Sequence, residues 1–458
     1  ITSVGTLSAL TVAGNLSVNG GTIKLDGNYP TGSFNVALGD IALQSGSLSG
    51  GSNTAIGRGS LYNNTSGANN TGIGRGSLDA NTTASNNTAV GMNAMFANTT
   101  GTQNVAVGAI SLDANTTGDN NTALGYQALT ANTTAGGNTA LGSGAMITST
   151  TASGDTAVGA FAMLRTTTGS QNTAVGLSAM ENTTTGYNNT SVGWESMKAN
   201  TEGALNVAVG QQAMLANTTG DKNVCVGHNT LAANTTADNN TAIGDNALGA
   251  NTTGANNTAC GQAAFAACTT GSDNAALGTG AGLALTTGSN NLLLGHDAGR
   301  TGSPGGNITS GSNTIVLGDE NIGNAHIQVD WTVASDQRDK TDFTALDLGL
   351  DFVKALAPVT YKWDKRSKYG DKTADDYDLA AQTPDGTHKE DWLDIGFKAQ
   401  EVEALEIAAG YDKDNKTNLI SSHTGDGKQM GLQYSKFVPI LVKAIQEQNA
   451  LIEALTTR

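Results

Sequence analysis

The hydrophobic positions of this chain recur every 17 residues over most of its length. A glycine marks each repeat in the range Gly57–Gly295, and the residue before it is nearly always aliphatic, as in Ile56. The residue two before the glycine is small, as in Ala55, and this alternation with a period of two predicts a short β-strand. Looser copies of the repeat flank the array at Gly39 and Gly318.

A second hydrophobic position follows each glycine. The residue three after the glycine is again small, and the residue four after it is Leu, Met or Phe in most repeats, as in Met95 and Met146. We expect a second short strand here, followed by a turn at Asn-Thr-Thr-Gly, because Asn and Gly tolerate positive φ. Each repeat would then hold two strands and two turns, and would bury one aliphatic residue and one Leu or Met. One such unit buries too little to fold alone, so the repeats predict a stacked β-solenoid.

The composition divides the chain into four segments. Residues 1–33 alternate apolar and small polar residues and predict a β-rich shaft or connector. Residues 34–320 form the β-solenoid of 17-residue repeats, residues 321–334 are a linker, and residues 335–458 are a globular domain rich in Lys, Arg and aromatic residues. The predicted fold is therefore mainly β, with a small α+β domain at its C-terminal end.

The pattern within the last segment changes from that of the repeats. "TALDLGLDFVKALAPVTYKW" predicts a helix ended by Pro358 and then a strand, and "WLDIGFKAQEVEAL" predicts a strand that runs into a helix. Residues 364–391 are polar and predict a loop or hairpin. The end of the chain, from Ser435, predicts one long helix.

This last helix carries hydrophobic residues in steps of three and four, as a coiled coil requires. The positions of this seam are Val438, Leu441, Ile445, Gln448, Ile452 and Leu455. Gln448 would be the one polar layer, which can set register and oligomeric state. A monomeric amphipathic helix is the alternative, because three heptads are few. The small positions of the repeats also suggest contact between chains, around a three-fold axis.

Charge and composition exclude several classes of protein. The formal net charge is −16, and a DNA-backbone binder needs a basic stripe instead, so no nucleic-acid partner is expected. No apolar run is long enough to span a bilayer, so no membrane insertion is expected. The cysteines Cys225, Cys260 and Cys268 form no disulfide framework and are expected to be buried thiols. No residue spacing indicates a metal site or a cofactor.

Two parts of the sequence resemble known families. The "NTAVG" repeat resembles the left-handed β-roll heads of trimeric autotransporter adhesins and the glycine-rich fibres of bacteriophages, over about residues 34–320. "SDQRDK", "LAPVTYKW", "IGFKAQEVEAL" and "GLQYSKFVPILVKAIQEQNALIEAL" resemble the self-cleaving intramolecular chaperone domain that ends phage tail spikes, tail fibres and endosialidases. The resemblance implies that residues 335–458 form a trimer, guide the folding of the preceding β-fibre, and are then released.

The same resemblance implies the residues of a cleavage site. The scissile bond would be Ala334–Ser335, with Ser335 as nucleophile and Lys340 as base, supported by Asp336 and Arg338. A serine hydroxyl needs a base, and lysine serves only when neutral, which burial or a positive neighbour such as Arg338 would favour. Each molecule would cut once. The alternative is that both residues lie on the surface of a folding cap that is never removed.

These inferences predict a homotrimeric phage tail fibre for host adsorption, assembled in the host cytoplasm and then part of the virion. Its partners would be upstream tail or baseplate proteins and a host cell-surface receptor, either a polysaccharide or an outer-membrane protein. A polysaccharide-degrading tail spike and a bacterial trimeric adhesin are the alternatives. The threonine arrays leave an ice-binding surface as a further alternative.

Overall fold

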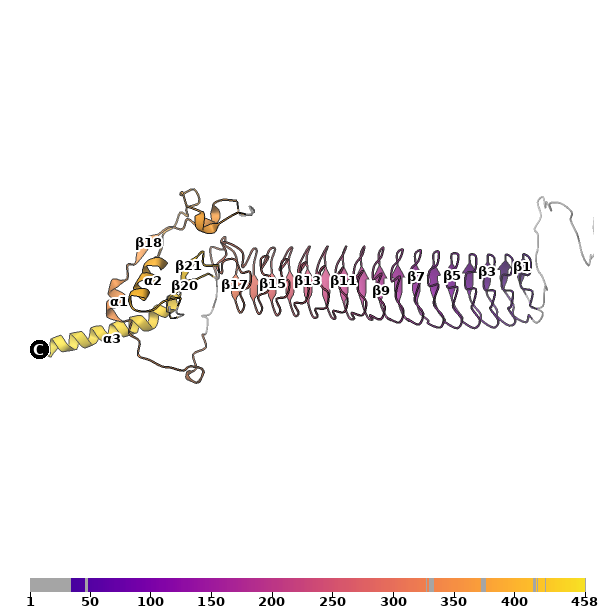
Figure 1. Ribbon diagram of the computed structural model, residues 1–458, viewed down its shortest axis with the longest axis horizontal. Helices are drawn as coiled ribbons and strands as arrows, with labels where there is room; N and C mark the ends of the chain where they lie inside the picture. Colours follow the sequence, from indigo (N-terminus) through magenta and orange to yellow (C-terminus); the bar gives the residue numbers. More distant parts are fainter. Residues whose placement is uncertain are drawn as a thin grey trace, which may run out of the picture. The chain divides into compact units, whose positions relative to one another are not determined.

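The computed structural model describes residues 34–45, 48–326, 328, 333–371, 376–414, 417, 419–424 and 426–457. The predicted shaft at residues 1–33 lies outside this part. Two compact units, Ile1–Leu177 and Ser178–Arg458, divide the chain. Stacked coils of the solenoid fill the described part of the first unit and begin the second, which also holds the C-terminal domain (Figure 1).

The first unit holds nine strands of three residues among its described residues. They are β1 (Val36–Leu38), β2 (Thr54–Ile56), β3 (Thr71–Ile73), β4 (Thr88–Val90), β5 (Val105–Val107), β6 (Thr122–Leu124), β7 (Thr139–Leu141), β8 (Thr156–Val158) and β9 (Thr173–Val175). Consecutive strands pair in parallel, and from β2 onward each residue faces its counterpart one repeat later, as Thr71 faces Thr88. One coil of the solenoid is therefore one sequence repeat.

The second unit continues the same pattern over eight strands of its described part. They are β10 (Thr190–Val192), β11 (Val207–Val209), β12 (Val224–Val226), β13 (Thr241–Ile243), β14 (Thr258–Cys260), β15 (Ala275–Leu277), β16 (Leu292–Leu294) and β17 (Ile315–Leu317). These strands also pair in parallel, and the predicted β-solenoid is confirmed. The last step is longer than the others, because Leu292 faces Ile315.

The middle residue of each strand points into the coil. Ala55 and Ala89 are fully buried, whereas Ile73, just before the repeat glycine, is 36% exposed. The prediction that each repeat buries this aliphatic residue is therefore wrong. The Leu or Met four residues after the glycine already fills the narrow interior, so the strand has room for little more than a methyl group. The small residues pack within one chain, and the prediction that they contact another chain is also wrong.

The second strand predicted in each repeat does not form in the described coils. Its key residue, the Leu or Met four after the glycine, has a left-handed backbone, with φ of +52° at both Met95 and Met146. A left-handed residue cannot continue a strand, so this part of the coil is a series of turns. It still bonds to the next coil, because the N–H of Met95 donates to the carbonyl of Ser111 at 3.0 Å.

Two ladders of buried asparagines run through the coils. In the first, Asn70 donates from Nδ2 to the carbonyl of Ala84 at 2.8 Å, and its Oδ1 accepts the N–H of Asn87 at 3.0 Å. In the second, Nδ2 of Asn81 donates to Oδ1 of Asn64 at 2.8 Å. An amide side chain can donate and accept at once, so it satisfies polar groups that the coil removes from water. This explains why Asn recurs at both positions.

The repeat glycine is required by conformation and by space. Gly91 has φ of +141°, and a Cβ built there would lie 2.4 Å from the carbonyl oxygen of Gly108 in the next coil. No L side chain satisfies both conditions without moving the backbone. The glycine thus sets how closely successive coils stack.

Among its described residues, the C-terminal domain combines three α-helices and four short 3₁₀ helices with two small antiparallel sheets. Its elements are η1 (Gln337–Asp339), α1 (Leu350–Ala355), β18 (Val359–Tyr361), η2 (Arg366–Lys368), η3 (Leu379–Ala381), β19 (Asp394–Gly396), α2 (Ala399–Ala408), β20 (Ser421–His423), β21 (Met430–Leu432), η4 (Tyr434–Lys436) and α3 (Phe437–Thr456). The predicted helix before Pro358, the strand that follows it, the strand–helix pair and the terminal helix are confirmed. The hairpin β20–β21 was not predicted, although "TGDGK" between its strands is a turn sequence.

A compact apolar cluster holds this domain together. It consists of Leu348, Phe352, Val402, Ile420, Phe437 and Ile440, which come from all three helices and the segments beside them. The buried carboxylate of Glu406 on α2 accepts the backbone N–H groups of Leu419 at 2.8 Å and Ile420 at 2.6 Å. These bonds tie α2 to the start of β20, so the helices and the hairpin form one folding unit.

Two of the three cysteines are buried thiols, as the composition predicted. Cys225 and Cys268 are buried free thiols, and burial raises the pKa of the Cys268 thiol to about 11. Cys260 is half-buried and also free. Among the described helices, none combines the length and apolar character that a membrane span requires.

Candidate functional site

Ser335 and Lys340 are brought together by a single 3₁₀ turn, η1. Asp336 caps this turn, because its Oδ1 accepts the N–H of Arg338 at 2.9 Å. The turn reverses the chain, so Nζ of Lys340 lies 2.6 Å from Oγ of Ser335 and 3.3 Å from the carbonyl oxygen of Ser335. The two predicted catalytic residues therefore share a direct hydrogen bond.

This contact has the geometry that a serine–lysine pair needs. A nucleophilic hydroxyl must lie within hydrogen-bond reach of its base, and 2.6 Å meets that condition. Lysine can accept the hydroxyl proton only in its neutral form, which an apolar environment favours. However, every residue from Val333 to Ala345 is exposed in the single chain. Nothing in the described part of this chain supplies that environment.

Asp336 and Arg338 pair with each other across the same turn. The guanidinium donates from Nε to Oδ1 at 3.1 Å and from Nη2 to Oδ2 at 2.5 Å. The hydrogen bond from Arg338 lowers the pKa of Asp336, and the same bond raises the pKa of Arg338. A carboxylate thus compensates the charge of Arg338, which weakens its predicted effect on Lys340. The ion pair between Asp336 and Arg338 instead stabilises the turn that joins Ser335 to Lys340.

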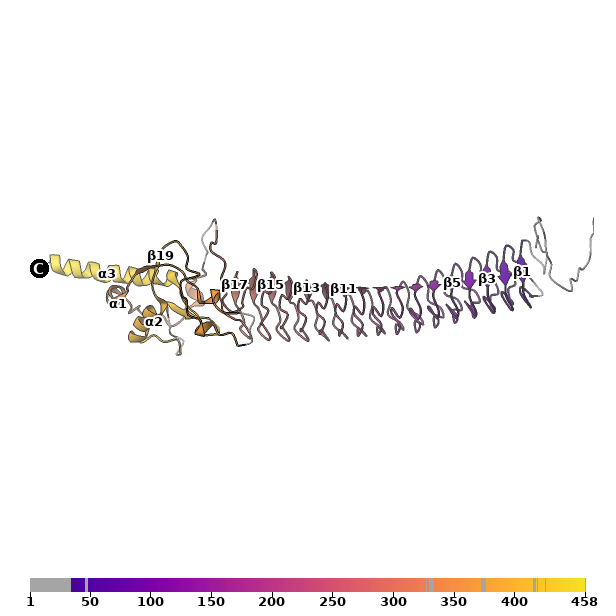
Figure 2. The same cartoon turned by 90° about the horizontal axis from the view of Figure 1, so that it is seen from above.

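The seam of α3 lies on the exposed side of that helix. Val438 is 60% exposed, Ile445 64% and Leu455 72%, and Leu441, Gln448 and Ile452 are also exposed. The buried residues of α3, which are Phe437, Ile440 and Ala444, occupy its N-terminal half. The C-terminal half extends beyond α1 and α2 in both views (Figure 1, Figure 2). The seam is therefore largely open to solvent in the described single chain.

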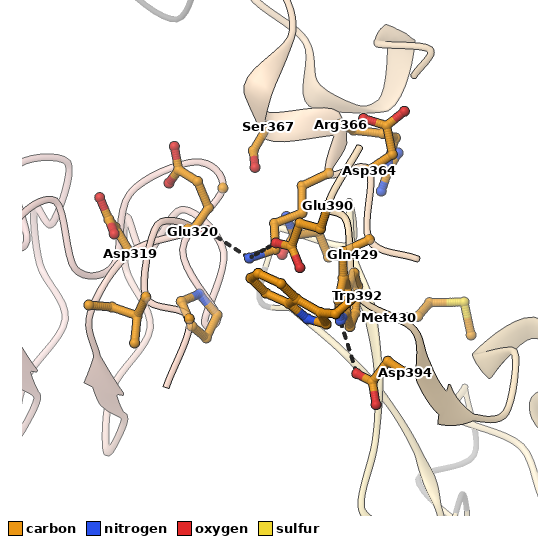
Figure 3. Close-up of a pocket in the computed structure, with 16 residues that line it drawn as sticks. Asp319, Glu320, Asp364, Arg366, Ser367, Glu390, Trp392, Asp394, Gln429 and Met430 are labelled. Carbon is orange, nitrogen blue, oxygen red and sulfur yellow. Dashed lines mark hydrogen bonds and ion pairs between the residues drawn. The ribbon is translucent and has the colours of Figure 1, made fainter. Parts of the chain in front are cut away.

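Contacts between the end of the solenoid and the C-terminal domain were not predicted. Nζ of Lys365 donates to the carbonyl of Glu320 at 2.9 Å and lies 3.7 Å from the carboxylate of Glu390 (Figure 3, dashed lines). A cavity of about 570 Å³ lies beside this contact, and Trp363 and Trp392 are among its lining residues. The sequence held one signal for this region, since the step from Gly295 to Gly318 exceeds the 17-residue repeat.

The C-terminal segment matches a known family. The family model Peptidase_S74, described as "Chaperone of endosialidase", matches residues 335–411. The match begins at Ser335 itself. No curated protein matches the chain, and no solved structure does. Residues 335–411, which follow the β-solenoid, are thus similar to the chaperone-of-endosialidase family.

Proposed function

We propose that this chain belongs to a phage tail fibre or tail spike and carries its own folding chaperone. One observation carries the proposal: a chaperone-of-endosialidase domain directly follows a parallel β-solenoid. That combination fits a fibre that adsorbs to a host surface. The solenoid would contact a host cell-surface receptor, either a polysaccharide or an outer-membrane protein, and its N-terminal side would join upstream tail proteins.

The repeats explain why the fibre needs a chaperone. Neighbouring coils are nearly identical, so one chain shifted by 17 residues along another would lose few contacts. Weakly specified β-pairing of this kind slips and aggregates. A non-repetitive domain that assembles first would align the chains, and the solenoid could then form from a fixed end.

Two apolar surfaces support a homotrimer. The outer face of strands β10–β17 carries no charged side chain in the described structure, and it exposes residues such as Ile243 and Leu277. The exposed seam of α3 is the second surface. Water-exposed apolar stripes of this length are expected to be covered by other copies of the chain. In this proposal, the aliphatic residues on the outer face contact the other chains of the trimer, rather than the small residues of each repeat for which we first expected that contact.

The proposed reaction is one cut between Ala334 and Ser335. Oγ of Ser335 attacks the carbonyl carbon of Ala334 while Nζ of neutral Lys340 takes the hydroxyl proton. The peptide C–N bond breaks, the proton passes to the amine of Ser335, and an ester to Oγ remains. Water then hydrolyses this ester, which leaves a carboxylate on Ala334 and restores the hydroxyl. Because the site is exposed in one chain, assembly would have to supply the burial that neutralises Lys340.

Expression of the wild-type chain beside a Ser335→Ala variant tests this function. We expect a C-terminal fragment that begins Ser-Asp-Gln from the wild type only, identified by N-terminal sequencing. If both chains stay intact after trimers have formed, the cleavage is refuted. Synthesis without residues 335–458 should give aggregated or non-trimeric fibre, and a soluble trimer from that chain would refute the chaperone role.

A further inference from the structure

The last coil of the solenoid contains an insertion. Gly318 follows Gly295 by 23 residues instead of 17, and the extra residues are 301–306, "TGSPGG". The coil keeps its core, because Ile308 is buried and Leu292 still faces Ile315. The insertion is therefore not needed to close the coil, and it forms a loop on its surface.

Internal bonds hold the inserted loop in one shape. Ser303 is fully buried, and its Oγ accepts the N–H of Gly299 at 3.1 Å and donates to the carbonyl of Gly306 at 3.3 Å. The N–H of Gly306 also donates to the carbonyl of Ser303 at 2.9 Å. A loop with this many internal bonds is pre-organised to receive a partner.

Two parts of the chaperone domain meet this end of the solenoid. In the β20–β21 loop, Oδ2 of Asp426 accepts the N–H of Asn307 at 3.0 Å, and its Oδ1 accepts from Thr424 and from the N–H of Lys428. At η2, Nζ of Lys368 donates to Oδ1 of Asn321, beside the Lys365–Glu320 contact shown in Figure 3. Both contacts bridge residues on opposite sides of the bond Ala334–Ser335.

The inserted glycines show how closely the two parts approach. A Cβ on Gly306 would lie 2.7 Å from Cβ of Thr424, and a Cβ on Gly302 would lie 2.9 Å from Cβ of Ser367. The interface is nevertheless hollow, because cavities of about 570 and 490 Å³ adjoin it. It depends on a few polar contacts rather than on a packed apolar core, which suits a contact that must later open.

We propose that residues 301–306, together with Asp319–Asn321, form a docking site for the chaperone domain of the same chain. We name this set the end-coil site. Its occupant is residues 335–457, and the contacts persist after the backbone is cut, since none of them needs an intact linker. Cleavage and release are therefore separate events, and release follows only when the end-coil site opens. The biological meaning of release rests on the proposed function, but docking itself does not.

The test uses the full chain with Ser335→Ala, so that self-cleavage plays no part. A recognition sequence for a site-specific protease is placed after Gly323, and the linker is cut with that protease after assembly. Size-exclusion chromatography then measures how much C-terminal fragment elutes with the solenoid. We expect the fragment to stay bound at first and to dissociate slowly on dilution.

Two glycine variants in this background separate docking from backbone strain. Gly306→Ala should speed dissociation at least tenfold, because its Cβ meets Thr424. Gly410→Ala is the control for backbone strain, since Gly410, which follows α2 and lies outside both contact segments, also has a positive φ, of +92°, and its Cβ would meet no atom within 4 Å. Lys365→Ala, which removes a second contact, should also speed dissociation and guards against misfolding of the glycine variant.

The outcomes distinguish the two proposals. Immediate loss of the fragment from the unsubstituted background overturns docking, and so does equal dissociation from the Gly306→Ala and Gly410→Ala variants. Because an added protease makes the cut, an inactive Ser335 would leave this readout unchanged. Suppose that the wild-type chain never cuts itself, while the Ser335→Ala chain retains its fragment after the added protease has cut the linker. That pair of results would refute the self-cleavage and leave docking supported.

Discussion

Replacement of Asp155 by asparagine should stabilise the coils around it, most strongly at alkaline pH. Asp155 occupies a position of the first ladder where the neighbouring coils have Asn138 and Asn172. It is fully buried, and its Oδ1 accepts the N–H of Asn172 at 2.7 Å. Its Oδ2 is buried and makes no hydrogen bond within the described structure. In an asparagine that atom would be an NH₂ group able to donate to a carbonyl, as Asn138 donates to Ala152 at 2.8 Å.

The magnitude follows from the ionisation of this carboxyl. Burial raises the pKa of Asp155 from 3.8 to about 7, although hydrogen bonds from Asn172 oppose the rise. The folded-state pKa of Asp155 lies above its unfolded-state pKa. The contribution of this carboxyl to the free energy of unfolding is therefore fully present below about pH 4 and is lost as the pH rises through about 7. At roughly 1.4 kcal/mol per pH unit, the full loss is about 4 kcal/mol, of which about 3 kcal/mol falls between pH 5 and pH 9.

Amide hydrogen exchange in residues 138–172 is the suitable assay, because long solenoids unfold too slowly for equilibrium measurements. Wild type and Asp155→Asn are compared at pH 5 and at pH 9. The quantity to compare is the protection factor of the variant divided by that of the wild type. We expect this ratio to be about 100 times larger at pH 9 than at pH 5. Asn121→Asp is the matched reverse change, since Nδ2 of Asn121 donates to Ala135 at 2.9 Å. A ratio of protection that is equal at both pH values would refute the reasoning.

Two further changes test the core of the coil and the helix seam. Met95→Ala should destabilise its coil by about 2–5 kcal/mol, because Met95 is fully buried. Met92→Ala is the control and should change exchange protection little, since Met92 is 44% exposed. Equal effects of the two changes would contradict the placement of Met95 inside the coil. Ile445→Asp should abolish trimers in sedimentation velocity while the far-UV circular dichroism of the chain is retained, since Ile445 is 64% exposed in one chain and is not part of its apolar cluster. Asp351→Asn, on the exposed face of α1, is its control, and trimers that survive Ile445→Asp would argue against the seam.

Much of this protein could be predicted from local sequence patterns. The 17-residue period predicted the parallel stacking, because identical segments repeated at one spacing can pair in register. The break in composition at Ser335 coincides with the start of the family match. The helix before Pro358 and the terminal helix were also predictable, since capping, proline and apolar spacing act within a few residues. The pair Ser335 and Lys340 was predicted only through the resemblance of "SDQRDK" to the self-cleaving chaperone domain, since the spacing of a serine and a lysine indicates nothing by itself.

Tertiary structure decided which side of each strand faces inward. Alternation with a period of two shows that two faces differ, but the volume inside the coil determines that Ala55 is buried and Ile56 is not. The same volume places Met95 inside through a left-handed turn where propensity suggested a strand. The contact of Asn307 with Asp426 joins residues more than a hundred positions apart, so no local pattern could specify it. Sequence by itself determined the repeat and its glycine, whereas packing between distant segments decided the interior, the exposed apolar face and the contacts between the last coil and the C-terminal domain.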